Sequence, residues 1–286
     1  MVKPILSDPQ KNKSLIEFGY VVVNNFLTDG EITKLLNFYQ KSPVRTNQTF
    51  HTTHFSKDVS YKNEVNECII LNVERSIEEH FIDYNAVFAN FMIKEAGGNN
   101  PMPLHADWTY VDEDSSSSYA IWIPLVDTNI NNGCIGVIPY SQHLSHNVRG
   151  PRILQWEHPA NDILIGGMGR LLPMKKGQAL IYNHRTLHYS PPNNSGRVRP
   201  AINISLVPEG EQIVHYTIPE EKNEILKFLV DDPLFFLDYD NFQMPKHGKI
   251  IAKIPTPIPV FNDSVPSFIE QCNRKGIFSV LKKFMS

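Results

Sequence analysis

A His-x-Asp triplet, His105-Ala106-Asp107, is the first feature of this sequence that could bind a metal ion. Side chains alternate along an extended chain, so both donors would lie on the same side of it. Two imidazoles and one carboxylate on one face of Fe(II) leave the other coordination positions open, as a non-haem iron oxygenase requires. The triplet alone is a weak signal, because a chain of 286 residues with 11 histidines can contain one by chance. Its position after the turn-rich segment 97–104 strengthens the signal, since loops beside strands often carry function.

The third metal ligand has to come from a distant part of the chain. The segment 177–203 offers two candidates, His184 and His188. Downstream of both, Arg199 lies in a β-rich run whose apolar neighbours should be buried, and a buried arginine is costly unless a carboxylate pairs with it. A planar guanidinium that holds a carboxylate through two hydrogen bonds suits a dicarboxylic cosubstrate. The competing Arg197 lies in an Asn-, Ser- and Gly-rich turn, where we expect it to be solvated.

These residues occur in blocks that resemble the phytanoyl-CoA dioxygenase family of Fe(II)- and 2-oxoglutarate-dependent oxygenases, over residues 88–206. The blocks are PLHADW, IWIPLVDTNINNGCIGVIPYSQH, GQALIYNHRTLHYSPPN and the R-x-A that begins at Arg199. In that family the distal histidine is followed by x-Ser, and the arginine comes eleven positions after the histidine. His188 and Ser190 fit this spacing with Arg199, whereas His184 does not.

The resemblance implies a double-stranded β-helix core (a jelly roll, cupin-like) that binds Fe(II), 2-oxoglutarate and O2. It implies that the iron ligands and catalytic residues are His105, Asp107 and His188. It also implies that the cosubstrate is bound by Arg199, Ser190 and Trp122. The reaction implied is hydroxylation of a small molecule with release of succinate and CO2. Halogenating relatives have a small residue in place of the carboxylate ligand, so the presence of Asp107 disfavours halogenation.

One block departs from the family pattern. Where relatives usually read Pro-Gly-Ser-His, this chain reads Pro-Tyr-Ser-Gln-His over 139–143, which alters a turn but no ligand. Two other functions remain open from the residues alone: a cupin-like metal-dependent isomerase, which would not need Arg199, and a non-catalytic binding protein on the same fold.

The elements that position these residues are predicted to be mainly β, with flanking helices. Short runs rich in β-branched and aromatic residues are separated by Gly, Pro and Asn turns; they cover 86–96, 118–127, 133–139, 177–183 and 199–208. This spacing favours a sandwich or barrel over a βαβ array. We expect one domain over 1–286, with a helical N-terminal part at 1–85, the β-helix core at about 86–207 and a C-terminal extension at 217–286.

Within the N-terminal part, the sequence predicts a short strand in 15–27, a helix with Thr28 as its N-cap, and a helix over 62–81. The tail is expected to pack on the core, with a helix over 219–230 and an amphipathic helix near 265–284.

Two regions outside the core have alternative interpretations. The acidic, serine-rich segment 112–118 is either a mobile lid or a plain loop. Arg149 and Arg152 lie in a long insertion at 141–173, and loops of that length often cover functional sites. They could bind an anionic group of the substrate, but surface arginines are the favoured interpretation.

Composition narrows the class of partner to a small molecule. The net charge of −3 gives no basic footprint for nucleic acid or for an anionic membrane surface. No apolar run approaches the ~18–20 residues that span a bilayer, and the N-terminus lacks the apolar core of a secretory signal. The three cysteines are widely spaced, which predicts neither a disulfide framework nor a metal knuckle. We therefore expect a cytoplasmic protein; its oligomeric state is not set by the sequence.

Overall fold

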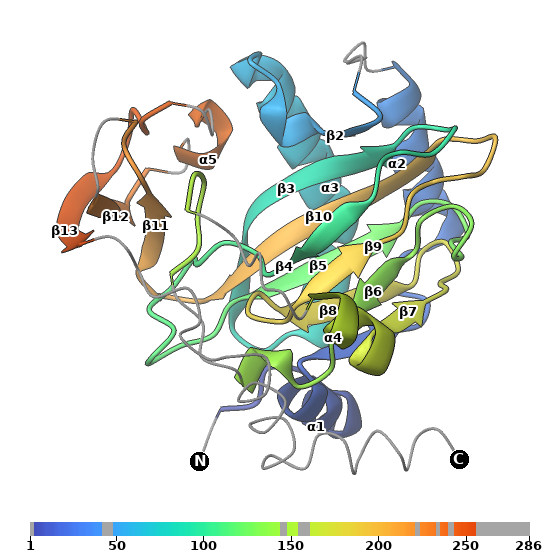
Figure 1. Ribbon diagram of the computed structural model, residues 1–286, viewed down its shortest axis with the longest axis horizontal. Helices are drawn as coiled ribbons and strands as arrows, with labels where there is room; N and C mark the ends of the chain where they lie inside the picture. Colours follow the sequence, from blue (N-terminus) through green and yellow to red (C-terminus); the bar gives the residue numbers. More distant parts are fainter. Residues whose placement is uncertain are drawn as a thin grey trace.

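The structure, a computed structural model, describes residues 3–41, 48–143, 148–153, 161–220, 224–232, 235–239 and 243–255. Two antiparallel sheets form its centre (Figure 1). The major sheet contains, in spatial order, β1 (Tyr20–Val23), β8 (Ala179–Asn183), β5 (Tyr119–Pro124), β10 (Arg199–Pro208), β3 (Tyr84–Lys94) and β2 (Phe50–Thr52). The minor sheet contains β4 (Met102–His105), β9 (His188–Ser190), β6 (Ile135–Val137) and β7 (Arg170–Leu172).

Helices cover the outer face of the major sheet: α1 (Pro9–Phe18), α2 (Asp29–Lys41) and α3 (Val59–His80). Alternate side chains of the strands point to these helices and form the largest core, which includes Phe91, Ile121, Ile202, Leu35 and Val65. Each such side chain contributes about 1.5–3 kcal/mol when it is fully buried.

The inner face of the major sheet packs on the minor sheet. Trp122, Leu180 and Tyr182 of the major sheet share a buried cluster with Ile135 and Val137 of the minor sheet. Two antiparallel sheets packed in this way confirm the prediction of a mainly β, jelly-roll fold with flanking helices.

Local signals explain where the N-terminal helices begin. Thr28 and Glu31 form a capping box at the start of α2: Glu31 Oε2 accepts from the Thr28 N–H at 2.7 Å, and Thr28 Oγ1 accepts from the Glu31 N–H at 3.3 Å. The predicted helix start is therefore confirmed. Helix α3 begins after its N-cap Asp58, a little before the predicted start.

Helix α1 was not predicted, and part of it lies in the segment 15–27 that was expected to form a strand with flanking turns. Its signals are the N-cap Asp8, whose side chain accepts from two backbone N–H groups, and Pro9 at the first helical position. The predicted short strand in 15–27 is confirmed by β1, whereas β2 was not predicted; both strands belong to the major sheet.

The C-terminal region forms a third sheet from β11 (Ile213–Thr217), β12 (Glu224–Val230) and β13 (Lys249–Pro255). The short helix α5 (Phe235–Asp238) lies between β12 and β13 in the chain. The predicted helix over 219–230 is wrong, because β12 pairs with a strand on each side.

An extended chain lets β12 bury both of its faces, which outweighs the helix propensity of its Glu, Lys and Leu residues. Ile225 enters one cluster, while Leu226 and Phe228 enter another with Phe88 of β3 and with α5. The helix predicted near 265–284 lies outside the described residues.

The insertion at 141–173 contains a 3-10 turn (Ser141–His143), helix α4 (Asn161–Met168) and strand β7. Among the described residues, no helix combines the length and hydrophobicity needed to cross a membrane.

Candidate metal centre

Two neighbouring strands of the minor sheet bring the predicted iron ligands together. His105 ends β4 and is paired in register with His188, which begins β9, and their ring centroids are 4.2 Å apart. Asp107 follows β4, so its Oδ1 lies 3.9 Å from His105 Nε2 and 3.6 Å from His188 Nε2. The three donor atoms all lie within 4.8 Å of one another, so they could hold one metal ion.

Backbone carbonyls orient both imidazoles. His105 Nδ1 lies 2.7 Å from the carbonyl oxygen of Pro103, and His188 Nδ1 lies 3.0 Å from that of Thr186. A carbonyl can only accept, so each Nδ1 carries the proton and each Nε2 presents its lone pair toward Asp107. Burial, reinforced by His188, lowers the pKa of His105 to about 4, so this ring is neutral at pH 7, as a ligand must be.

Asp107 is held at three points. Tyr182 Oη donates to Asp107 Oδ2 at 2.9 Å, which leaves Oδ1 directed at the histidines. Its backbone N–H donates to the carbonyl of His184 at 3.0 Å, and its own carbonyl accepts from Arg149 Nε at 2.6 Å. Burial would raise the pKa of Asp107, but the neighbouring histidines and Tyr182 outweigh it and lower this pKa. The carboxylate is therefore ionised at neutral pH.

A cavity opens beside the three donors, between the sheets. Arg199 reaches it from β10 and is only 3% exposed, yet its Nε and Nη1 have no hydrogen-bond partner among the described residues. The guanidinium carbon lies 5.5 Å from the ring centroid of Trp122, in a cation–π contact. Burial lowers the pKa of Arg199 to about 10, which still leaves it charged at pH 7. Unpaired buried donors of this kind fit an anionic ligand such as a carboxylate.

A second cation lies next to this arginine. Lys94 is the register partner of Arg199 and is fully buried, and its Nζ donates to the carbonyls of Ser190 and Pro191. Burial, and then the charge of Arg199, lower the pKa of Lys94 to about 7. Sequence reasoning missed Lys94, although a lysine inside an otherwise apolar strand was a signal. It also missed Tyr182, which that reasoning treated as an ordinary strand residue.

The structure brings all six predicted site residues to one cavity: His105, Asp107, Trp122, His188, Ser190 and Arg199. The rival His184 is fully buried next to Asp107, but its Nδ1 lies 2.7 Å from Ser118 Oγ and its ring does not belong to the donor group. Arg197 is exposed, as predicted. The favoured surface interpretation of Arg149 is wrong, because its guanidinium is buried against Glu113.

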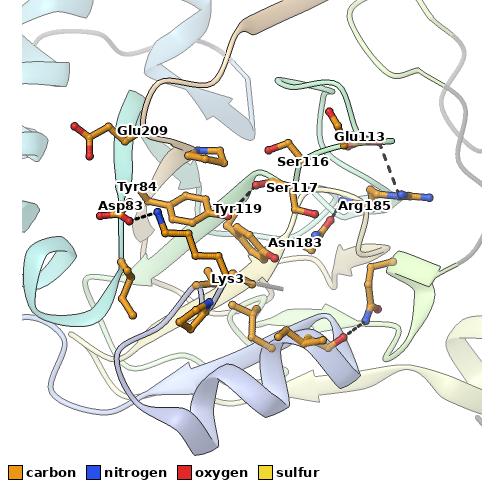
Figure 2. Close-up of a pocket in the computed structure, with 18 of the residues that line it drawn as sticks. Lys3, Asp83, Tyr84, Glu113, Ser116, Ser117, Tyr119, Asn183, Arg185 and Glu209 are labelled. Carbon is orange, nitrogen blue, oxygen red and sulfur yellow. Dashed lines mark hydrogen bonds and ion pairs between the residues drawn. The ribbon is translucent and has the colours of Figure 1, made fainter. Parts of the chain in front are cut away.

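A larger cavity of about 610 Å³ lies at one end of the major sheet, where β3 and β5 begin and β8 and β10 end, and it shares no lining residue with the cavity at the metal centre. Figure 2 shows its walls, where Lys3 pairs with Asp83, and where Glu113 meets Arg185 at an N···O distance of 3.9 Å. The segment at 113–117, part of the predicted lid or loop, lines this cavity and not the one at the metal centre.

Comparisons with solved structures agree with this fold. The carbocyclase SnoK from nogalamycin biosynthesis is 16% identical with a TM-score of 0.54, over 73% of this chain and 86% of its own. The epimerase SnoN, solved with Fe3+, alpha ketoglutarate and nogalamycin RO, is 16% identical with a TM-score of 0.54, over 87% and 94%. EvdO2 from Micromonospora carbonacea var. aurantiaca, solved with 2-oxoglutarate, is 17% identical with a TM-score of 0.50, over 77% and 98%.

Among sequences, no curated protein matches the chain. The sequence model of the phytanoyl-CoA dioxygenase (PhyH) family does match, over residues 15–201. That span is well over half of the 286 residues. The chain therefore belongs to the phytanoyl-CoA dioxygenase family, whose members are iron- and 2-oxoglutarate-dependent oxygenases, as its sequence blocks predicted.

Proposed function

We propose that this protein is an Fe(II)- and 2-oxoglutarate-dependent dioxygenase that hydroxylates a small organic molecule and releases succinate and CO2. One observation carries the proposal: three metal donors and a buried, unpaired arginine open into the same cavity. A protein that bound only a metal ion would not need a buried arginine in the same cavity as the metal donors.

Each residue then has a defined task. Iron would be held by Nε2 of His105 and His188 and by Oδ1 of Asp107. Bound iron supplies the activation of O2 that couples decarboxylation of 2-oxoglutarate to oxidation of the substrate. Arg199 would pair with the far carboxylate of 2-oxoglutarate, beside the hydroxyl of Ser190. The buried surroundings exclude water from this ion pair and so strengthen it.

The outcome of the oxidation is part of the proposal. Asp107 supplies the carboxylate ligand that halogenating relatives lack, which supports oxygenation over halogenation. The similar structures include proteins named as a carbocyclase and an epimerase, so this fold carries several outcomes. Product mass separates them: hydroxylation adds one oxygen atom, cyclisation or desaturation removes two hydrogens, and epimerisation leaves the mass unchanged.

A matched pair of histidine variants tests the site. We expect His188→Ala to lose Co(II) binding in an anaerobic titration, and to lose the visible absorption that a chelating 2-oxo acid produces on Fe(II). His184→Ala, four residues away and not a donor, should retain both signals. The reverse pattern would show that the ligand assignment is wrong.

The wild-type protein tests the reaction class. A screen over small metabolites should give succinate only with Fe(II), 2-oxoglutarate and an accepted substrate present. Substrate turnover that continues without 2-oxoglutarate would instead support the metal-dependent isomerase. A folded protein with no affinity for Fe(II) or 2-oxoglutarate would support the non-catalytic binding protein.

A further inference from the structure

Arg149 is a buried arginine that reaches the metal centre from the insertion after β6. It is 8% exposed, and its Nε donates to the backbone carbonyl of Asp107 at 2.6 Å. Its own backbone is joined to Thr109 in both directions: the Arg149 N–H donates to Thr109 Oγ1 at 3.0 Å, and its carbonyl accepts from the Thr109 N–H at 3.1 Å. Three hydrogen bonds therefore fix Arg149 against the stretch of chain that begins with a proposed metal ligand.

Glu113 closes that stretch onto the same guanidinium. Arg149 Nη1 donates to Glu113 Oε2 at 3.0 Å and Nη2 donates to Oε1 at 2.6 Å, a bidentate pair. The two side chains are only 9% and 13% exposed, so solvent screens the pair weakly. The loop that leaves Asp107 is thus anchored to Arg149 at its start, at Thr109 and at its end.

The segment that carries Arg149 is itself fixed from behind. A Cβ added to Gly150 would lie 1.9 Å from the carbonyl oxygen of Tyr216, so the two backbones are in close contact. Thr217 Oγ1 donates to the carbonyl of Pro151 at 3.3 Å. Strand β11 therefore fixes the segment that carries Arg149. Because Arg149 contacts Asp107, this segment also helps to hold the metal ligand in place.

We propose that the Arg149–Glu113 pair is a positioning device for the metal ligand Asp107, an inference that rests on the proposed metal function. The guanidinium holds the ligand through its backbone carbonyl, while Tyr182 holds the carboxylate itself. A lone buried arginine here would repel a metal dication. Glu113 neutralises that charge, so the pair supplies geometry without adding net charge to the centre.

Charge and geometry make opposite predictions for Arg149→Met. This variant removes one positive charge near the centre and leaves Glu113 with the 3.9 Å contact to Arg185, so a purely electrostatic role predicts tighter metal binding. A positioning role predicts weaker binding, because the contact with the Asp107 carbonyl is lost. The double variant Arg149→Met/Glu113→Gln has the net charge of the wild type, so any change in its metal affinity comes from geometry. Removing both partners of a buried pair also perturbs folding far less than removing one.

The experiment is a calorimetric titration of each full-length apo protein with Co(II), together with the visible d–d absorption of the bound ion, which reports ligand geometry. We expect the double variant to bind Co(II) about 10-fold more weakly and with an altered spectrum. Loss of a hydrogen bond to a metal ligand typically lowers metal affinity by at least this factor. Arg149→Met should also bind more weakly. Arg149→Lys keeps the charge but not the planar fork, and should fall between the wild type and Arg149→Met.

The control removes an exposed pair: Asp127→Asn/Lys175→Met breaks a 2.8 Å ion pair, again without changing net charge, and should leave Co(II) binding unchanged. Wild-type affinity in the double variant, or tighter binding in Arg149→Met, would overturn the positioning role while leaving the proposed function intact. Absence of Co(II) binding by the wild-type protein would overturn both.

Discussion

Arg199 gives the sharpest prediction, because the same substitution should stabilise the empty protein and abolish cosubstrate binding. Burial lowers the pKa of Arg199 to about 10, from a reference value of about 12.5. One pKa unit corresponds to about 1.4 kcal/mol, so the buried charge costs the empty fold about 3 kcal/mol. Arg199→Met keeps most of the side-chain volume and removes that cost, while it gives up about 1 kcal/mol of cation–π contact with Trp122. The net expectation is a gain of about 2 kcal/mol, or roughly 4 °C in Tm.

Binding of 2-oxoglutarate should change in the opposite direction. Loss of one partner from a buried, hydrogen-bonded charge pair typically costs about 2–5 kcal/mol. Since about 1.4 kcal/mol is a factor of ten, Arg199→Met should bind 2-oxoglutarate roughly 30- to 4,000-fold more weakly. A ligand at about 100 times its Kd stabilises the wild-type protein by about 2.7 kcal/mol. The same concentration should stabilise Arg199→Met by less than about 1 kcal/mol.

Thermal unfolding with Mn(II), with and without 2-oxoglutarate, measures both effects in one assay. The matched control is Arg197→Met, which removes an exposed arginine two residues upstream and should change neither value. Two results would refute the reasoning. Either the empty Arg199→Met protein unfolds at a lower temperature than the wild type, or 2-oxoglutarate stabilises both proteins equally.

Other substitutions follow from contacts near the centre. Tyr182→Phe removes the donor to Asp107 Oδ2, so Co(II) affinity measured by titration should fall about 10-fold while the fold is retained. Burial lowers the pKa of His215 to about 3 from 6.5, so the unfolded chain takes up a proton between these values that the folded protein does not. Stability therefore falls as pH drops through this window, and His215→Phe should recover about 3 kcal/mol at pH 4 in urea unfolding, with no change at pH 8. Gly150→Ala places a methyl group against the carbonyl of Tyr216 and should cost about 2 kcal/mol or more in the same assay at pH 8.

The sequence was sufficient where one local pattern determined the outcome. The capping box at Thr28 fixes the start of α2, and the β-rich runs of the core appear as β3, β5, β6, β8 and β10. The six candidate site residues, which line one cavity, could be proposed because their types and spacing match a family pattern, and Arg199 also because an arginine in a buried strand is costly unless a carboxylate pairs with it. These predictions did not depend on how distant segments of the chain pack together.

Packing between distant segments could not be predicted. Glu113 and Arg149 are each ordinary loop residues in the sequence, and nothing local indicates that they meet beneath Asp107. The segment that forms β12 has the composition of a helix, and only its two partner strands make the extended form the better one. Helix propensities differ by less than about 1 kcal/mol per residue, so such pairing readily overrides them.

The charges that line the cavity favour the binding of a metal ion together with a dicarboxylate. Asp107 and Arg199 both line the cavity. Asp107 carries a negative charge, and Arg199 carries a positive charge whose Nε and Nη1 have no hydrogen-bond partner among the described residues. Lys94 lies beside the arginine, with a pKa lowered to about 7. A metal dication beside Asp107 and a dicarboxylate paired with Arg199 together add no net charge, so each ligand offsets the charge that the other brings into the cavity. Linkage makes this coupling reciprocal. The cavity is therefore arranged to hold both ligands together better than either one alone.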